Sequence, residues 1–215
     1  MRIGILGSGL MGGKLGTLFA RAGRDVVFSY ARSWEKLDRL AREAGGNASA
    51  GTPKEAALGA DALLLAVHWS RIDDVLKQTG DLAGKVIVSC SLPLNADNTE
   101  LVLGHTTSGA EALAEKVPSA EVVSAFNNIP SEVLFGVFAA RGKGTPPSML
   151  YCGDTQAGKD IAATLISDVG FDPIDVGPLR SARCTRGRSR MIIAHLAYGG
   201  SEGPELAYRF ERFGK

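Results

Sequence analysis

The chain has 215 residues, of which 45% are hydrophobic and 22% are charged, and its formal net charge at pH 7 is +1. This composition is typical of a packed globular protein with one large domain, or with one domain and a small second one. The near-zero net charge argues against a nucleic-acid-binding protein, and no apolar run approaches the roughly 18 residues that a membrane span needs.

The cysteines and the N-terminus point to a reducing compartment. Three cysteines, Cys90, Cys152 and Cys184, lack paired spacing, so the sequence predicts neither a disulfide framework nor a metal site. Met1 leads directly into an apolar segment with no recognisable signal peptide. We therefore expect a cytoplasmic protein with no membrane or nucleic-acid partner.

The most informative motif follows the first predicted strand, which runs from Arg2 to about Leu6. The next six residues contain the Gly-x-Gly-x-x-Gly pattern, and a helical pattern over about 10–22 follows it: Gly7, Ser8, Gly9, Leu10, Met11 and Gly12. Between a strand and a helix, this pattern is the fingerprint of a dinucleotide-binding Rossmann unit. Gly7 permits the tight turn, Gly9 lets the backbone approach a pyrophosphate, and Gly12 lets the helix pack closely on the strand.

The second predicted strand, at about 25–30, indicates which dinucleotide is bound. NAD-binding proteins usually place an acid at the end of this strand, where it binds the ribose 2′-hydroxyl. This chain has no acid there; instead Arg32, Ser33 and Lys36 follow the strand. Two cations and a hydroxyl suit the extra 2′-phosphate of NADP, so we predict NADP as the cofactor. The alternative is that these residues only form the solvated start of a helix.

The remaining pattern alternates strands and helices, which predicts a doubly wound α/β fold of Rossmann type with a mainly parallel sheet. Further strands are predicted at about 61–67, 85–89, 121–125, 148–153 and 171–176, and further helices at about 34–44, from Pro53, from Ile72 and at 155–168. We expect residues 1–145 to form the NADP-binding domain, and residues 146–215 to form a small C-terminal α/β cap that completes the substrate cleft.

Ligands of open parallel sheets bind beyond the carboxyl ends of the strands. Three such ends should therefore face the dinucleotide: His68-Trp69, Ser91-Leu92-Pro93 and Asn127-Asn128-Ile129. His68 is either a catalytic acid or a neutral ring beside the nicotinamide ribose. Asn127 and Asn128 either bond to the carboxamide or serve as turn residues before Pro130.

Near the C-terminus, five arginines and no acid lie between Arg180 and Arg190, ahead of an apolar segment. Clustered arginines before a helix suit an anionic ligand, either a substrate or the phosphates of the cofactor. The alternative is a solvated basic stretch.

Taken in order, several segments resemble the NADPH-dependent coenzyme F-420 reductase family, which is also similar to the nucleotide domain of the membrane ferric reductases called STEAP. The segments are Gly7–Gly12, Arg32 to Lys36, 66–69, 122–130, 152–154, 175–179 and 203–206. The likeness covers almost the whole chain, and its most distinctive parts lie before Pro130 and around Gly177.

The resemblance implies a homodimer that exchanges a hydride between nicotinamide C4 and a deazaflavin, coenzyme F-420, as co-substrate. It places Ser8 to Met11 on the phosphates, Arg32 and Lys36 on the 2′-phosphate, and Val67, Leu92 and Asn127 near the nicotinamide. Ser189 and Leu206 correspond to positions on the deazaflavin side.

We assign no catalytic residue and no metal ligand, because hydride transfer between two rings depends on positioning rather than on acid–base groups. Two alternatives to the deazaflavin reductase remain. One is an NADPH reductase of a flavin, quinone or other anionic small-molecule acceptor. The other is an NADP-binding regulatory protein without turnover.

Overall fold

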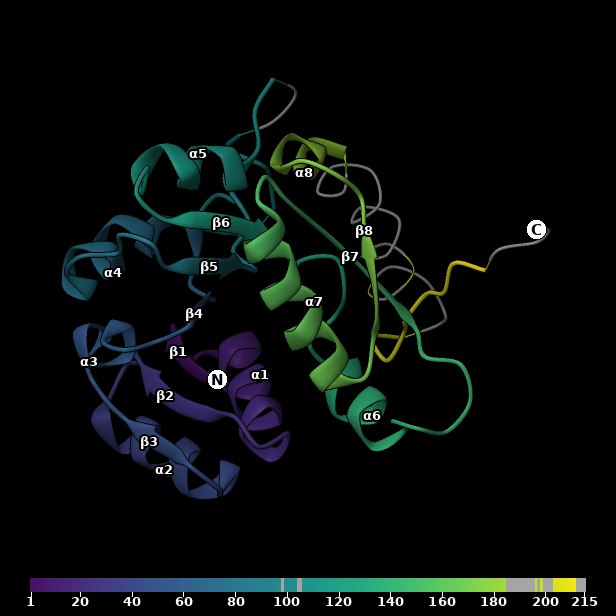
Figure 1. Cartoon of the computed structure of the whole chain (residues 1–215), viewed down its shortest axis with the longest axis horizontal. Helices are drawn as coiled ribbons and strands as arrows, with labels where there is room; N and C mark the ends of the chain where they lie inside the picture. The colour runs from purple at the N-terminus through teal and green to yellow at the C-terminus, as the bar shows by residue number, and fades with distance from the viewer. Residues whose placement is uncertain (98, 104–105, 185–195, 197, 199–202, 212–215) are drawn as a thin grey trace.

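The computed structural model describes residues 1–97, 99–103, 106–184, 196, 198 and 203–211 (Figure 1). Its strands are β1 (Arg2–Leu6), β2 (Asp25–Ser29), β3 (Ala48–Ala50), β4 (Ala62–Leu65), β5 (Val86–Ser89), β6 (Glu121–Ser124), β7 (Ser148–Gly153) and β8 (Asp172–Asp175). Its helices are α1 (Leu10–Arg21), α2 (Trp34–Ala44), α3 (Pro53–Ala57), α4 (Ile72–Thr79), α5 (Gly109–Lys116), α6 (Val133–Ala139), α7 (Gln156–Val169) and α8 (Ala182–Cys184), with 3-10 turns η1 (Trp69–Arg71) and η2 (Leu179–Ser181).

The strands form one sheet in the order β3-β2-β1-β4-β5-β6-β7-β8. Every neighbouring pair is parallel except β6 and β7. From β1 the chain first adds β2 and β3 on one side of the sheet, and it then adds β4 to β8 on the other side. The carboxyl ends of β1 and β4 therefore form the topological switch point, where this kind of fold binds its ligands. The predicted Rossmann-type, mainly parallel α/β fold is confirmed.

Both faces of the sheet are buried, which explains why its strands read as continuous apolar runs. Along β4, Ala62 and Leu64 face one apolar cluster, whereas Leu63 and Leu65 face another. The first cluster includes residues of α1, α2, α6 and α7, and the second includes residues of α3, α4 and α5. The sheet is thus a rigid central layer whose carboxyl edge carries the exposed loops.

Local sequence signals account for most helix starts. Thr52 and Glu55 form a reciprocal capping box around the first turn of α3, with Pro53 at its first position, as expected. The N-cap of α7 is Thr155, whose hydroxyl accepts from the Gly158 amide. The preceding residue, Asp154, accepts from the amide of Leu179.

Four of the strands and α-helices were not predicted: β3, α5, α6 and the three-residue helix α8. β3 is a three-residue edge strand of small residues, so it carries no apolar alternation. The helices α5 and α6 are eight and seven residues long, and each contains glycine, which weakens a helical pattern.

The region predicted as a C-terminal cap contributes β7, α7 and β8, which extend the same sheet. In Figure 1, α7 lies across the sheet on the side of α1. The turn after α1 is joined to α7 by Arg24, whose guanidinium donates two hydrogen bonds to Asp168, at 2.7 and 2.9 Å. The expected closure over the cleft falls mostly on residues 185–202, of which the structure describes 196 and 198. The division at residue 145 therefore stays a prediction.

The fit between α1 and the sheet yields a stability prediction. A Cβ at Gly12 would collide with the carbonyl oxygen of Gly7 and lie 2.9 Å from the Ala66 Cβ, so Gly12→Ala must push α1 outward. We expect the free energy of unfolding to fall by about 2 kcal/mol or more, measured by urea denaturation.

The matched control is Gly136→Ala in α6, where an added Cβ would meet nothing within 4 Å. That variant should match the wild type or gain up to about 1 kcal/mol from helix propensity. Equal urea midpoints for the two variants would contradict the proposed packing.

Candidate nucleotide and substrate site

Two cavities adjoin at the carboxyl edge of the sheet. The larger, of about 960 Å³, is lined by the glycine turn after β1 and by the start of α2; we call it the glycine-turn cavity. The smaller, of about 440 Å³, is lined by residues after β4, β5 and β6, including Asn127 and Asn128; we call it the asparagine cavity. Leu10, Ala66, Val67 and His68 line both. An elongated ligand could therefore pass from one cavity to the other over the N-terminus of α1.

The glycine turn presents backbone amides to the point where the cavities meet. Gly7 has a φ of 107°, a left-handed conformation that glycine adopts without strain. Gly9 is the N-cap of α1, and no side chain caps this helix. The amides of the first helical turn have no partners within the helix, so they and the helix dipole form an anion site. A Cβ at Gly9 would meet nothing within 4 Å, which leaves the backbone accessible to a phosphate.

Ser8 stabilises this turn rather than facing the cavity with its hydroxyl. Its side chain is fully buried, and its Oγ donates to the Ser29 carbonyl oxygen at 2.9 Å. Its amide also points to β2, where the carbonyls of Ser29 and Tyr30 accept from it. Leu10 and Met11, at the start of α1, do reach the cavities. Leu10 is 66% exposed, and Met11 lines the asparagine cavity.

The predicted 2′-phosphate residues come together at the start of α2. Arg32, Ser33 and Lys36 all line the glycine-turn cavity. Ser33 is the N-cap of α2, and its hydroxyl accepts from the Lys36 amide at 3.4 Å. The segment is therefore both the start of a helix and part of the cavity wall. Glu35 is fully exposed, and hydrogen bonds from its own backbone amide and from Ser33 lower the pKa of its carboxyl group. The cavity thus gathers two cations, a hydroxyl and a helix N-terminus.

The lining of the glycine-turn cavity also includes residues that were not predicted. Tyr30 follows β2 with a φ of 55°, a conformation that costs an aromatic residue about 1–2 kcal/mol. Its hydroxyl donates to the carboxylate of Asp74, and burial, followed by that hydrogen bond, raises the pKa of Tyr30 to about 12. Arg71 and Trp34 also line this cavity, and Trp34 is half exposed. The only sequence signal was the position of Tyr30 at a strand end.

His68 is engaged through both ring nitrogens. Its Nδ1 lies 2.9 Å from the hydroxyl of Ser70 and accepts from the Ser70 amide, which caps η1. This arrangement assigns the proton to Nε2, which lies 3.1 Å from the carbonyl oxygen of Asn95. A ring so bonded anchors the loop. Whether His68 is a catalytic acid or a neutral ring beside the nicotinamide ribose stays a prediction.

The asparagine cavity has mostly apolar walls with a few polar groups, as is typical of small-molecule sites. Val67, Leu92 and Ile129 line it, together with Ser91, which was among the predicted strand-end residues, and Cys90, which was not predicted. Ser91 joins two strand ends, because its hydroxyl donates to the Val67 carbonyl at 2.8 Å. Pro93 is buried and lies outside the residues that line either cavity.

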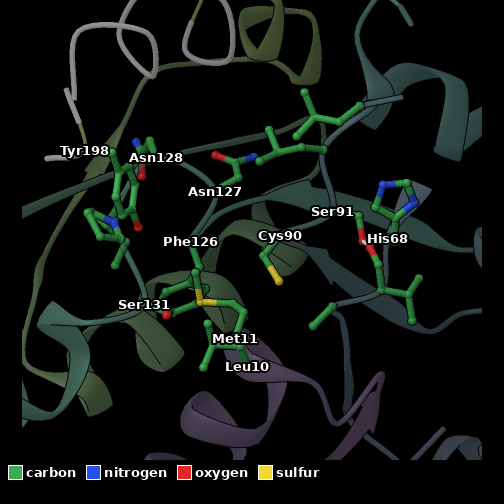
Figure 2. A pocket seen from close by; sticks show the side chains of 16 residues that line it. Leu10, Met11, His68, Cys90, Ser91, Phe126, Asn127, Asn128, Ser131 and Tyr198 are labelled. Atoms are coloured by element: carbon green, nitrogen blue, oxygen red, sulfur yellow. Dashed lines mark hydrogen bonds between the residues drawn. The ribbon is translucent and has the colours of Figure 1, made fainter. Parts of the chain in front are cut away.

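Asn127 and Asn128 both lie in the wall of the asparagine cavity (Figure 2), in a loop that hydrogen bonds hold in place. The amide nitrogen of Asn127 donates to the hydroxyl of Ser124 at 2.8 Å, and that of Asn128 donates to the hydroxyl of Tyr208 at 2.7 Å. Lys14 of α1 donates to the Ser131 carbonyl at 3.0 Å and so ties the loop to the glycine-turn helix. Both asparagines are at least 95% buried, although both line the cavity.

The remaining predicted contacts lie near the C-terminus. Ser189 lies outside the described residues. Leu206 is half-buried and is absent from the lining of both cavities. Of the arginine stretch, Arg183 donates to the carboxylate of Glu111 at 2.9 Å, so this arginine joins α8 to α5. The pKa of Glu111 is lowered, first by that hydrogen bond.

Sheet order, switch point and glycine turn together define a Rossmann-type dinucleotide-binding protein. Residues 2–93 match the model of the family described as NADP oxidoreductase, coenzyme F420-dependent. Over this segment the chain is thus similar to a family of NADP oxidoreductases, and the resemblance seen in the sequence is confirmed.

A second likeness is to metalloreductase STEAP3 of Rattus norvegicus, with 30% identity over 182 residues. The aligned part covers 85% of this chain and 35% of the rat protein. The chain thus spans about a third of the length of this curated relative.

Solved structures share the fold over nearly the whole chain. A protein from Arthrobacter sp. FB24, provisionally assigned as an F420-dependent NADP-reductase, has a TM-score of 0.83 and 22% identity, covering 99% of this chain and 100% of that one. Protein SMa0349 from Sinorhizobium meliloti has a TM-score of 0.77 and 28% identity, covering 98% and 96%. A reductive aminase from Aspergillus terreus, solved with NADPH, has a TM-score of 0.61 and 19% identity, covering 92% of this chain and 60% of that one.

None of the helices in the described part of the chain combines the length and the apolar character that crossing a membrane would require.

Gly9 provides a test of the anion site that is separate from stability. Because an added Cβ at Gly9 would meet no protein atom, Gly9→Ala should leave the urea midpoint within experimental error of the wild type. The same Cβ would obstruct a phosphate on the α1 amides, so the dissociation constant of NADPH should rise about tenfold or more, measured by fluorescence titration. Unchanged NADPH affinity in this variant, with Gly136→Ala as control, would rule out phosphate binding at the turn.

Proposed function

We propose that this protein transfers a hydride between the nicotinamide of NADPH and a deazaflavin, coenzyme F-420, bound in the asparagine cavity. One observation carries the proposal: a site suited to a phosphorylated dinucleotide adjoins a mostly apolar cavity. Four residues line both: Leu10, Ala66, Val67 and His68. The family whose model matches residues 2–93 adds support, because its description names both cofactors.

The residues of the first cavity fit NADPH. The open backbone at Gly9 would hold the diphosphate, and Arg32, Ser33 and Lys36 would hold the 2′-phosphate. Glu35, the acid closest in sequence, is absent from the cavity lining, and Asp74, the acid that does line the cavity, accepts a hydrogen bond from the hydroxyl of Tyr30. This wall therefore favours the additional phosphate over a free ribose hydroxyl.

When bound, the reduced nicotinamide supplies the hydride. The protein contributes position and a dry environment: Val67, Leu92 and Ile129 form apolar walls that exclude water from the two rings. Asn127, whose amide nitrogen is held by Ser124, keeps a polar group at a fixed place on the loop after β6. No proton donor is required from the protein, in agreement with the fully bonded ring of His68.

A second candidate is an NADPH reductase of another acceptor, such as a flavin, a quinone or a ferric chelate. The likeness to a protein named metalloreductase STEAP3 supports this candidate, and among its acceptors it favours a ferric chelate. A third candidate is an NADP-binding protein without turnover.

Arg32 tests the cofactor assignment. Arg32→Ala should raise the Michaelis constant for NADPH about tenfold or more, because a charge-assisted contact to the 2′-phosphate is lost, and should barely change the use of NADH. The matched control is Arg39→Ala on the adjoining helix α2, an exposed arginine that faces Glu43 at 3.9 Å and lies outside the cavity lining. Equal losses with both coenzymes would refute the 2′-phosphate assignment.

The acceptor is tested by stopped-flow oxidation of NADPH against a panel of coenzyme F-420, FMN, quinones and ferric chelates. We expect the fastest turnover with coenzyme F-420, followed at 420 nm. Faster turnover with another member would establish the second candidate. Tight NADPH binding without oxidation by any acceptor would establish the third.

A further inference from the structure

Asn128 carries an unsatisfied polar atom in the wall of the asparagine cavity. The residue is 1% exposed, and its Nδ2 donates to the hydroxyl of Tyr208 at 2.7 Å. Its Oδ1 has no hydrogen-bond partner in the described part of the chain. A buried amide oxygen without a partner is unfavourable and rare in native proteins, so this atom calls for a ligand.

The orientation of this amide is set by its surroundings. Phe126, two residues before it, has a φ of 58° and is fully buried with its ring edge-to-face against Phe19, at 6.2 Å between centroids. On the other side, Tyr208 is fixed to β7, because its carbonyl accepts from the Ser148 amide at 2.8 Å. Since Tyr208 holds Nδ2, Oδ1 occupies the opposite side of the amide group.

Neighbouring polar side chains are already engaged. The amide of Asn127 is bonded to Ser124, and the hydroxyl of Tyr198 lies 3.1 Å from the carboxylate of Glu132. Figure 2 shows Asn127, Asn128 and Tyr198 along the wall of the cavity away from His68 and Ser91. Among the side-chain nitrogen and oxygen atoms of the described residues, Oδ1 of Asn128 is the one that is both buried and without a hydrogen-bond partner.

We propose that Oδ1 of Asn128 accepts a hydrogen bond from a planar amide N–H of a ligand in the asparagine cavity, and that this contact makes Asn128 a specificity-determining residue. The proposed function supplies two groups with this chemistry: the carboxamide of the nicotinamide and the ring imide of the deazaflavin. The identity of these two candidate ligands rests on the proposed function. An amide oxygen accepts from either N–H and rejects an isostere that lacks it.

The test compares ligands that differ by one N–H. The first pair is NADP and its 3-acetylpyridine analogue, in which a methyl ketone replaces the carboxamide. The second pair is 5-deazariboflavin and its N3-methyl derivative. Dissociation constants of both pairs are measured by calorimetry for the wild type, for Asn128→Leu and for Asn47→Leu, the same substitution at a remote, exposed asparagine that bonds to Asp25.

In the wild type and in Asn47→Leu, the N–H ligand of one pair should bind about tenfold more tightly, or more, than its analogue, equivalent to about 1.4 kcal/mol. Asn128→Leu should reduce that preference to within about twofold, and the pair affected identifies the source of the N–H. Equal binding within both pairs by the wild type, or an undiminished preference in Asn128→Leu, would overturn the proposal.

The design separates this inference from the proposed function. Binding is measured without turnover, so a protein that reduces no deazaflavin can still show, or fail to show, the amide preference. Asn128→Ala serves as a second variant if leucine prevents folding, because alanine removes the acceptor without adding bulk. The wild-type comparison requires no variant and is sufficient on its own to contradict the proposal.

Discussion

The close approach of α1 to the carboxyl ends of β1 and β4 is the constraint on which the rest of the structure depends. At Gly7 an added Cβ would lie 2.6 Å from the Ala66 carbonyl, and at Gly12 it would collide with the Gly7 carbonyl. Only glycine at both positions lets the helix begin directly beside the switch point. The free amides of α1 therefore lie where the sheet order opens a crevice.

Two bulky residues with left-handed backbone shape the walls of that crevice. Tyr30 directly follows β2, and its hydroxyl donates a hydrogen bond to Asp74. Phe126 comes soon after β6, and its ring packs on Phe19. Strain of this kind persists only where surrounding contacts enforce it, and it is concentrated at functional sites. Here it turns the chain out of the regular alternation of a strand, so that Asn127 and Asn128 both line one cavity.

Much of this architecture could be predicted from the sequence, because its signals are local. The apolar runs of β1, β4 and β5, the glycine turn and the Thr52 capping box each depend on neighbouring residues alone. The edge strand β3 carries no such signal, because its pairing with β2 is decided by the sheet. Helix α5 did carry one: Ser108 followed three residues later by Glu111 is a capping pattern, and the Ser108 hydroxyl does accept from the Glu111 amide at 3.2 Å.

The site divides in the same way. Arg32, Ser33 and Lys36 are close in sequence, so their convergence could be predicted from one helix start. The partners of Tyr30, His68 and Asn128 could not, because Asp74, Asn95 and Tyr208 are 44, 27 and 80 residues away. Long-range hydrogen bonds of this kind depend on tertiary packing. They decide whether a side chain is available to a ligand or is occupied in holding a loop.

The most direct test of the account is isothermal titration calorimetry of the wild-type protein with NADPH and with NADH. An anion site at the start of α1, combined with cations at the start of α2, predicts saturable binding of NADPH that is about tenfold or more tighter than that of NADH. The absence of binding heat with either nucleotide would contradict the account.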